Sequence, residues 1–257
     1  MIILSLDTSS ESASCALLEI TIEPLKPEAQ TSKITGIRLL SEYFLNTGMR
    51  RHSQTIAPMI DTMLKNAGIA PENLGKIACT VGPGSFTGIR IGISTAKAMA
   101  YGLGAATAGV STLDALAANA IYYEGLLCPM LDARNAQVYG GIYLNSTEGL
   151  SYGISECRAQ SLDEMASRLS TLCKKTGRKK LMLMGSGYRN NPDFWHAFAK
   201  QANEQENICV RFADSMDDHV KASVVGRLAA FGHLDIHPKE LKPQYMRETQ
   251  AERIRRS

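Results

Sequence analysis

Two glycine-containing loops are the first candidates for chemistry in this 257-residue sequence. The loop Gly82-Pro83-Gly84 precedes a helical pattern, and glycines before a helix N-terminus suit an anion. Because it lacks the Gly-Lys-Ser/Thr ending of a Walker loop, we interpret it as a structural turn that sets the angle of the helix. The segment from Gly185 to Gly187 follows a strand pattern, and a Gly-Ser-Gly sequence is equally typical of any tight strand-to-helix turn.

Cysteine and histidine spacing offers little for a metal or redox centre. The six cysteines never come closer than sixteen residues, so no CxxC pair exists, and we expect them to be reduced and mostly buried. Of the five histidines, His233 and His237 are four residues apart, but Pro238 follows them directly. We therefore expect no metal site.

Composition is typical of a globular domain, with 44% apolar and 21% charged residues, which excludes disordered and fibrous classes. The net charge of +3 is too small to indicate a nucleic-acid binder by itself. The end of the chain, from residue 237, is locally basic and is expected to be solvated surface, with phosphate contact as the alternative. Without a basic leader or a membrane-length apolar run, the sequence predicts a cytoplasmic protein.

The two halves of the chain begin alike. Residues 3–19 read ILSLDTSSESASCALLE, an apolar strand that ends at Asp7, a serine-rich turn and a second strand. Residues 128–144 read CPMLDARNAQVYGGIYL, where Asp132 takes the same place. Alternating helical and strand patterns follow each hairpin. This order predicts an α/β fold of two similar lobes, each with a mixed sheet flanked by helices.

Local signals place several elements. Residues 53–67 have helical apolar spacing closed by Gly68, and residues 77–81 and 181–184 are typical of buried strands. Ser161 with Glu164 forms a capping-box start for a helix that reaches residue 173. The polar, proline-containing segment 21–35 is interpreted as a surface insertion without chemistry.

Motifs spread over nearly the whole chain resemble the TsaB (YeaZ) family. They are RRHSQTIAPMIDTMLKNAGI from residue 50, IACTVGPGSFTGIRIGISTAKAMA from residue 77, LDTSSESASCALL near the start, GVSTLDALA at 109–117, LDARNAQVY at 131–139 and PQYMR at 243–247. The resemblance implies two ribonuclease H-like lobes of the actin, Hsp70 and sugar-kinase (ASKHA) type. We expect the lobes at 1–118 and 119–220, followed at 221–257 by a helix and basic tail that pack back on them.

The resemblance also implies a role in making threonylcarbamoyladenosine beside the anticodon of tRNA. In that family a TsaB protein forms a heterodimer with TsaD, which carries the transfer, and works with TsaE, an ATPase. A homodimer is implied when the protein is alone. Contact with tRNA is expected to be indirect or through the basic tail, and no membrane is involved.

A catalytic role for this chain is disfavoured by the same resemblance. TsaD carries two metal-binding histidines four residues apart, and this sequence has Thr112 and Leu116 at those positions. Leucine offers no lone pair to a metal. An older family label, glycoprotease, would need an activated nucleophile or a metal-bound water, and neither is found. The sequence therefore predicts an accessory subunit with no catalytic residue.

Nucleotide binding is the main alternative. The implied fold holds ATP and magnesium between two aspartate turns and a glycine motif, positions that match Asp7, Asp132, Gly185 and Gly187. Both aspartate turns lack the glycine that lets backbone approach a phosphate closely. We expect a vestigial cleft, with ATP or ADP and magnesium bound only in the assembled complex. A free-standing ATP-dependent enzyme of the sugar-kinase type, or a protease-like hydrolase, is the alternative function.

The helix after the Gly82 loop has small residues at four-residue intervals. They form a ridge that either packs on the protein's own sheet or lets a partner helix approach closely. The resemblance favours a partner surface, to which methionines add adaptable apolar contact. The predicted interface residues are Met59, Met63, Gly88, Gly92, Ala96, Met99 and Ala100.

Overall fold

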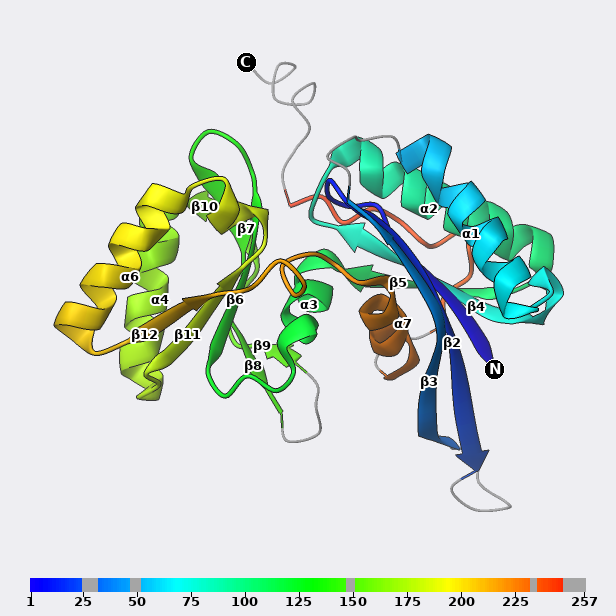
Figure 1. Ribbon diagram of the computed structural model, residues 1–257, viewed down its shortest axis with the longest axis horizontal. Coiled ribbons are helices and arrows are strands. Elements are labelled where there is room, and N and C mark those ends of the chain that lie inside the picture. The colour runs from blue at the N-terminus through cyan, green and yellow to red at the C-terminus, as the bar shows by residue number, and fades with distance from the viewer. Residues whose placement is uncertain (25–31, 47–51, 147–150, 232–234, 247–257) are drawn as a thin grey trace. The chain divides into compact units, whose positions relative to one another are not determined.

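The structure is a computed structural model that describes residues 1–24, 32–46, 52–146, 151–231 and 235–246. It contains two compact units (Figure 1). The first consists of Met1–Ala115 and Val220–Pro243, and the second of Leu116–His219 and the described residues after Pro243. The chain thus passes between the units near residues 115 and 220. The lobe boundaries predicted from the sequence are residues 118 and 220.

The first unit is built on a five-stranded mixed sheet with the order β3-β2-β1-β4-β5. The first three strands are antiparallel neighbours, and the last two run parallel to β1. The strands are β1 (Ile2–Asp7), β2 (Ala13–Pro24), β3 (Ser32–Leu45), β4 (Leu74–Gly82) and β5 (Ala106–Ser111). The helical elements are α1 (His52–Ala67), η1 (Pro71–Asn73), α2 (Phe86–Leu103) and α7 (Ala222–Phe231), and α3 (Thr112–Ala117) leads towards the second unit.

Alternation along β1 explains how both faces of this sheet are covered. Leu4 and Leu6 belong to the apolar cluster that contains the buried side chains of α1 and α2. Ser5 points to the other face, where its hydroxyl donates to the Ala222 carbonyl of α7 at 2.6 Å. Gly226 of α7 lies against Ser5 and Leu18, so this helix also packs closely on the sheet.

The second unit repeats this plan with the order β10-β7-β6-β11-β12, while β8 pairs with β6 and β9. Its strands are β6 (Leu126–Asp132), β7 (Gln137–Gly140), β8 (Tyr143–Asn145), β9 (Ser151–Gly153), β10 (Arg158–Ser161), β11 (Lys180–Met184) and β12 (Cys209–Phe212). Its helical elements are η2 (Ala118–Ala120), α4 (Leu162–Thr176), α5 (Ser186–Arg189) and α6 (Pro192–Glu206). In both units three antiparallel strands are followed by two parallel ones, which confirms the predicted α/β duplication.

The predicted end signals of the helices are observed. Gly68 follows α1 with φ of 65°, in the left-handed region that favours glycine. The Ser161 hydroxyl caps α4 by accepting from the Glu164 N–H at 3.1 Å.

The segment 21–35, interpreted from the sequence as a surface insertion, is exposed at residues 21–23 and forms strands in its described part. Residues 21–24 continue β2 and residues 32–35 belong to β3, with Ile22 paired to Ile34. β-branched residues of this kind favour extended backbone. Residues 25–31 lie outside the described part.

Within the described ranges, no helix combines the length and the apolar character that crossing a bilayer requires.

Candidate functional site

Asp7 ends β1 inside the first unit and is fully buried. Its Oδ1 accepts hydrogen bonds from the Ser9 N–H at 3.1 Å, the Ser9 hydroxyl at 2.6 Å and the Thr80 hydroxyl at 2.6 Å. No described group donates to its Oδ2. Burial raises the pKa of Asp7, and the bonds from Ser9 and Thr80 offset only part of that rise. The turn after β1 thus satisfies one carboxylate oxygen internally and leaves the other without a partner.

The loop between β4 and α2 packs directly on this turn. The Ser85 N–H donates to the Ser9 carbonyl at 2.7 Å, and the Thr8 hydroxyl donates to the Gly88 carbonyl at 2.7 Å. A side chain on Gly84 or Gly88 would collide with the backbone of Ser9 or Thr8. The glycines of this loop therefore serve close packing, in agreement with its interpretation as a structural turn.

Asp132 and the Gly185–Gly187 segment come together in the second unit. The Asp132 N–H donates to the Ser186 hydroxyl at 3.1 Å. Its carboxylate accepts from the Arg134 N–H at 2.8 Å and from the Asn190 side-chain amide at 2.9 Å. Both oxygens of this carboxylate are therefore engaged by the unit itself.

Two further residues, Asp218 and Arg189, contact the Gly185–Gly187 segment or one another, and neither was predicted from the sequence. The Gly185 N–H donates to Oδ1 of Asp218, whose side chain is buried. Oδ2 of Asp218 lies 2.5 Å from Nε of Arg189. A carboxylate, itself neutralised by the Arg189 guanidinium, thus occupies the Gly185 amide, which is therefore not available to a phosphate. Asp218 lies in an acidic stretch typical of solvated loops, so no local pattern identified it.

The ridge of small residues on α2 lies inside the first unit. Ala96 and Ala100 are 0% and 1% exposed. A Cβ on Gly92 would lie 2.7 Å from the Thr8 hydroxyl oxygen. The expectation that the ridge faces a partner is therefore wrong, because these small residues pack closely against the first unit's own sheet. The correction applies to Met63, Gly88, Gly92, Ala96 and Ala100, all of which are buried.

Met59 and Met99 differ from that group, since they pack against the core and remain partly exposed. On α2 the exposed side chains include Ser94, Ala98 and Tyr101, at helical spacing on the face opposite the ridge. On α1 the exposed positions include Ala57 and Pro58. We call the surface formed by Ala57 and Pro58 of α1 and by Ser94, Ala98 and Tyr101 of α2 the outer helix face.

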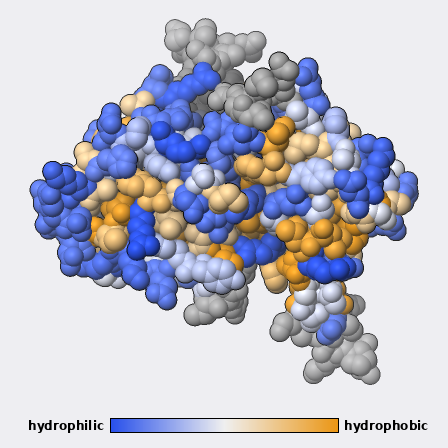
Figure 2. Space-filling view, viewed as in Figure 1, coloured by the Kyte–Doolittle hydropathy of each residue, from blue (hydrophilic) through white to orange (hydrophobic). Residues whose placement is uncertain are grey.

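Two further features bear on partner binding by the first unit. At the start of α2, the Arg90 guanidinium lies 3.9 Å from the centre of the Phe86 ring, which is itself 42% exposed. Apolar surface also gathers over the strands of this unit in Figure 2. Among the strand residues, Ile22 of β2 and Leu39 and Phe44 of β3 are exposed. Contiguous apolar surface of this kind is typical of interaction sites.

Thiol and metal chemistry find little support in the described residues. Burial raises the pKa of Cys15 and Cys79 to about 12 and that of Cys173 to about 11, which keeps these thiols protonated and unreactive. No group of three or more histidine, cysteine or acidic residues that could hold a metal occurs in this part of the chain. Thr112 and Leu116 are both buried. His233 lies outside the described residues, as do Arg247 and the residues after it.

Comparison with known proteins identifies relatives. The matching family model is described as TsaD, tRNA N6-adenosine threonylcarbamoyltransferase, and it covers residues 41–231, more than half of the chain. The tRNA threonylcarbamoyladenosine biosynthesis protein TsaB of Bacillus subtilis is 40% identical over 119 residues, 44% of this chain and 52% of that protein. The tRNA N6-adenosine threonylcarbamoyltransferase of Geotalea uraniireducens is 45% identical over 65 residues, 25% of this chain and 19% of that protein.

Matches to four curated TsaB proteins span between 46% and 65% of their own length. Among solved structures, a Pseudomonas aeruginosa protein described as similar to the peptidase YeaZ superposes with a TM-score of 0.68 at 24% identity, covering 96% of this chain and 99% of that one. This likeness confirms the fold. Because the family model described as TsaD covers more than half of the chain and four curated relatives at 32–40% identity are TsaB proteins, the chain belongs to this family, in its TsaB (YeaZ) group.

Proposed function

We propose that the chain is a non-catalytic subunit that pairs with a TsaD protein and works with TsaE in threonylcarbamoyl transfer to adenosine beside the anticodon of tRNA. One observation carries the proposal. The chain matches a transferase family over residues 41–231, yet Thr112 and Leu116 stand where the family resemblance places two metal-binding histidines. Leucine offers no lone pair to a metal, so at least one of the two ligands is missing.

The nucleotide-site geometry supports an accessory role. The Gly185 amide is bound to Asp218, and the carboxylate oxygens of Asp132 already accept hydrogen bonds. Both features oppose the binding of a phosphate by the chain alone. We propose that ATP or ADP with magnesium binds only in the assembled complex. A cytoplasmic location follows from the proposed role in tRNA modification.

For pairing with TsaD we propose the outer helix face. The exposed residues Ala57, Ser94 and Ala98 are small, so a partner helix can approach closely, and Met59 and Met99 add adaptable apolar contact at its margin. A homologous chain has a similar helix pair, so two such pairs can pack face to face. A second copy of this chain meets the same geometry, which supports a homodimer when TsaD is absent.

The change Ala98→Arg tests this surface. A long charged side chain at an exposed position should block close helix approach and weaken pairing with TsaD by about 100-fold or more, while the fold stays intact. Pairing would be measured by analytical ultracentrifugation and folding by circular dichroism. The matched control is Thr171→Arg on the exposed side of α4, which should leave pairing unchanged. Equal affinity of the Ala98→Arg variant and the wild type for TsaD would contradict the proposed surface.

A further inference from the structure

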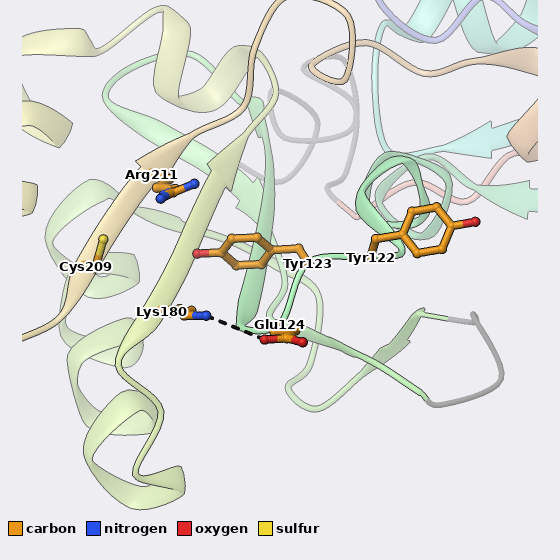
Figure 3. A pocket seen from close by; sticks show the side chains of 6 residues that line it. All are labelled: Tyr122, Tyr123, Glu124, Lys180, Cys209 and Arg211. Carbon is orange, nitrogen blue, oxygen red and sulfur yellow. Dashed lines mark ion pairs between the residues drawn. The ribbon is translucent and has the colours of Figure 1, made fainter.

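A hollow of about 290 Å³ opens on the second unit beside the starts of β11 and β12 (Figure 3). Lys180 of β11 pairs in register with Cys209 of β12, and Met182 pairs with Arg211. In-register residues of parallel strands share a face, so Lys180 and Arg211 project to the same side of the sheet. The alternate residues of β11, Leu181 and Leu183, are buried in the core with side chains of α4 and α6.

Tyr122, Tyr123 and Glu124, from the segment between η2 and β6, form the remaining wall of this hollow. Figure 3 shows the Tyr123 ring pointing towards β11 and β12, between Arg211 and Lys180. Its hydroxyl is buried, and no described group is hydrogen-bonded to it. Burial raises the pKa of Tyr123 to about 12, so the hydroxyl is a neutral donor at physiological pH.

The charge around the hollow favours an anion. Arg211 has no ion pair among the described residues, so its guanidinium donors are available. Lys180 has one weak partner, because Glu124 lies 3.6 Å away and its side chain is 86% exposed. Two cations, Lys180 and Arg211, and one acid, Glu124, thus line the hollow.

Tyr122 indicates which anion fits. Its side chain is 92% exposed and points away from Tyr123 in Figure 3. A tyrosine ring left in water on the far side of Tyr123 from Arg211 and Lys180 suits RNA, where a base can stack on an aromatic ring while a neighbouring phosphate meets arginine and lysine. Free phosphate or an acidic peptide would use the cations but would leave this ring without a role.

We propose that this hollow binds a phosphate group of RNA through Arg211, Lys180 and the Tyr123 hydroxyl, while Tyr122 stacks on an adjacent base. The inference rests on the proposed role in tRNA modification and adds a contact surface to it, distinct from the basic end of the chain. It makes the second unit an RNA-binding surface and leaves the first unit for the protein partner.

The test is fluorescence anisotropy with a labelled RNA hairpin that has the sequence of an anticodon stem-loop. Arg211→Gln should weaken binding about tenfold and lower the slope of log K against log salt by about 0.7 to 0.9. Tyr122→Ala should weaken binding about tenfold through lost stacking. The matched control is Arg158→Gln on β10, at the opposite edge of the same sheet, which should change affinity less than about twofold.

Three results would overturn the inference. The first is equal weakening by Arg211→Gln and Arg158→Gln, which would mean unspecific charge attraction. The second is no RNA binding by the wild-type chain, either alone or with TsaD. The third is displacement of RNA by millimolar inorganic phosphate or ADP in an Arg211-dependent way, which would identify a free phosphate ligand. If the chain pairs with TsaD but binds RNA independently of Arg211, the inference about the hollow is wrong, while the proposed function as a subunit is not contradicted.

Discussion

Asp7 has a structural role in the first unit. The carboxylate is buried, its Oδ1 is held by Ser9 and Thr80, and the Gly84–Gly88 loop packs on the turn that carries it. Burial penalises its charged form, which is why its pKa lies above the usual range. The folded chain therefore holds the Asp7 proton more tightly than the unfolded chain does.

That difference predicts a pH dependence. Protonated Asp7 contributes fully to the free energy of unfolding below the pKa that it has in the unfolded chain, near 3.8. This contribution is lost as the pH rises through the raised pKa of Asp7 in the folded chain. Asp7→Asn removes the charge, so the free energy of unfolding of this variant, relative to wild type, should rise between pH 4 and pH 8. Urea unfolding at several pH values measures it. Asp61→Asn, at an exposed position on α1, is the control, and a pH-independent difference for Asp7→Asn would count against the burial argument.

At the scale of elements, α2 shows why a helical pattern alone does not reveal which face meets a partner. Small residues at four-residue intervals line one side of this helix, and that side packs on β1 and its turn. The opposite side carries exposed residues such as Ser94 and Ala98. Close packing of the inner side fixes the helix position, and the outer helix face remains available.

Two glycines of α2 test this orientation. Gly88→Ala should lower the free energy of unfolding by about 2 to 4 kcal/mol, because its methyl group would collide with the Thr8 carbonyl. Gly102→Ala, in the same helix with no atom within 4 Å of its added Cβ, should raise stability by about 0.5 to 1 kcal/mol. Thermal and urea unfolding provide the measurement. Equal effects of the two changes would show that the ridge is not packed as described.

At the scale of the whole molecule, both units carry the same strand order and a separate apolar core. The second unit places Asp132, Gly185 and Asp218 together, but the carboxylate of Asp218 takes the glycine amide. Side chains of the second unit itself therefore already occupy the Asp132 carboxylate and the Gly185 amide.

A nucleotide titration tests that conclusion. Isothermal calorimetry of the isolated chain with ATP and magnesium should give a Kd weaker than about 1 mM, since Asp218 occupies the Gly185 amide that would bind a phosphate. After TsaD is added, binding should appear. Tight binding and turnover by the chain alone would instead favour the sugar-kinase type of enzyme.

The sequence by itself determined the repeated strand–aspartate–strand plan, the capping of α4 by Ser161 and the left-handed glycine after α1. These features depend on neighbouring residues, whose dihedral preferences and apolar period are visible in any single chain. The family followed from the resemblance of the sequence motifs. Only the tertiary structure decided that the ridge of α2 faces inward, that Asp218 holds Gly185, and that Tyr123, Lys180 and Arg211 enclose one hollow. Such contacts join segments far apart in the chain, and long-range packing rather than local preference selects them.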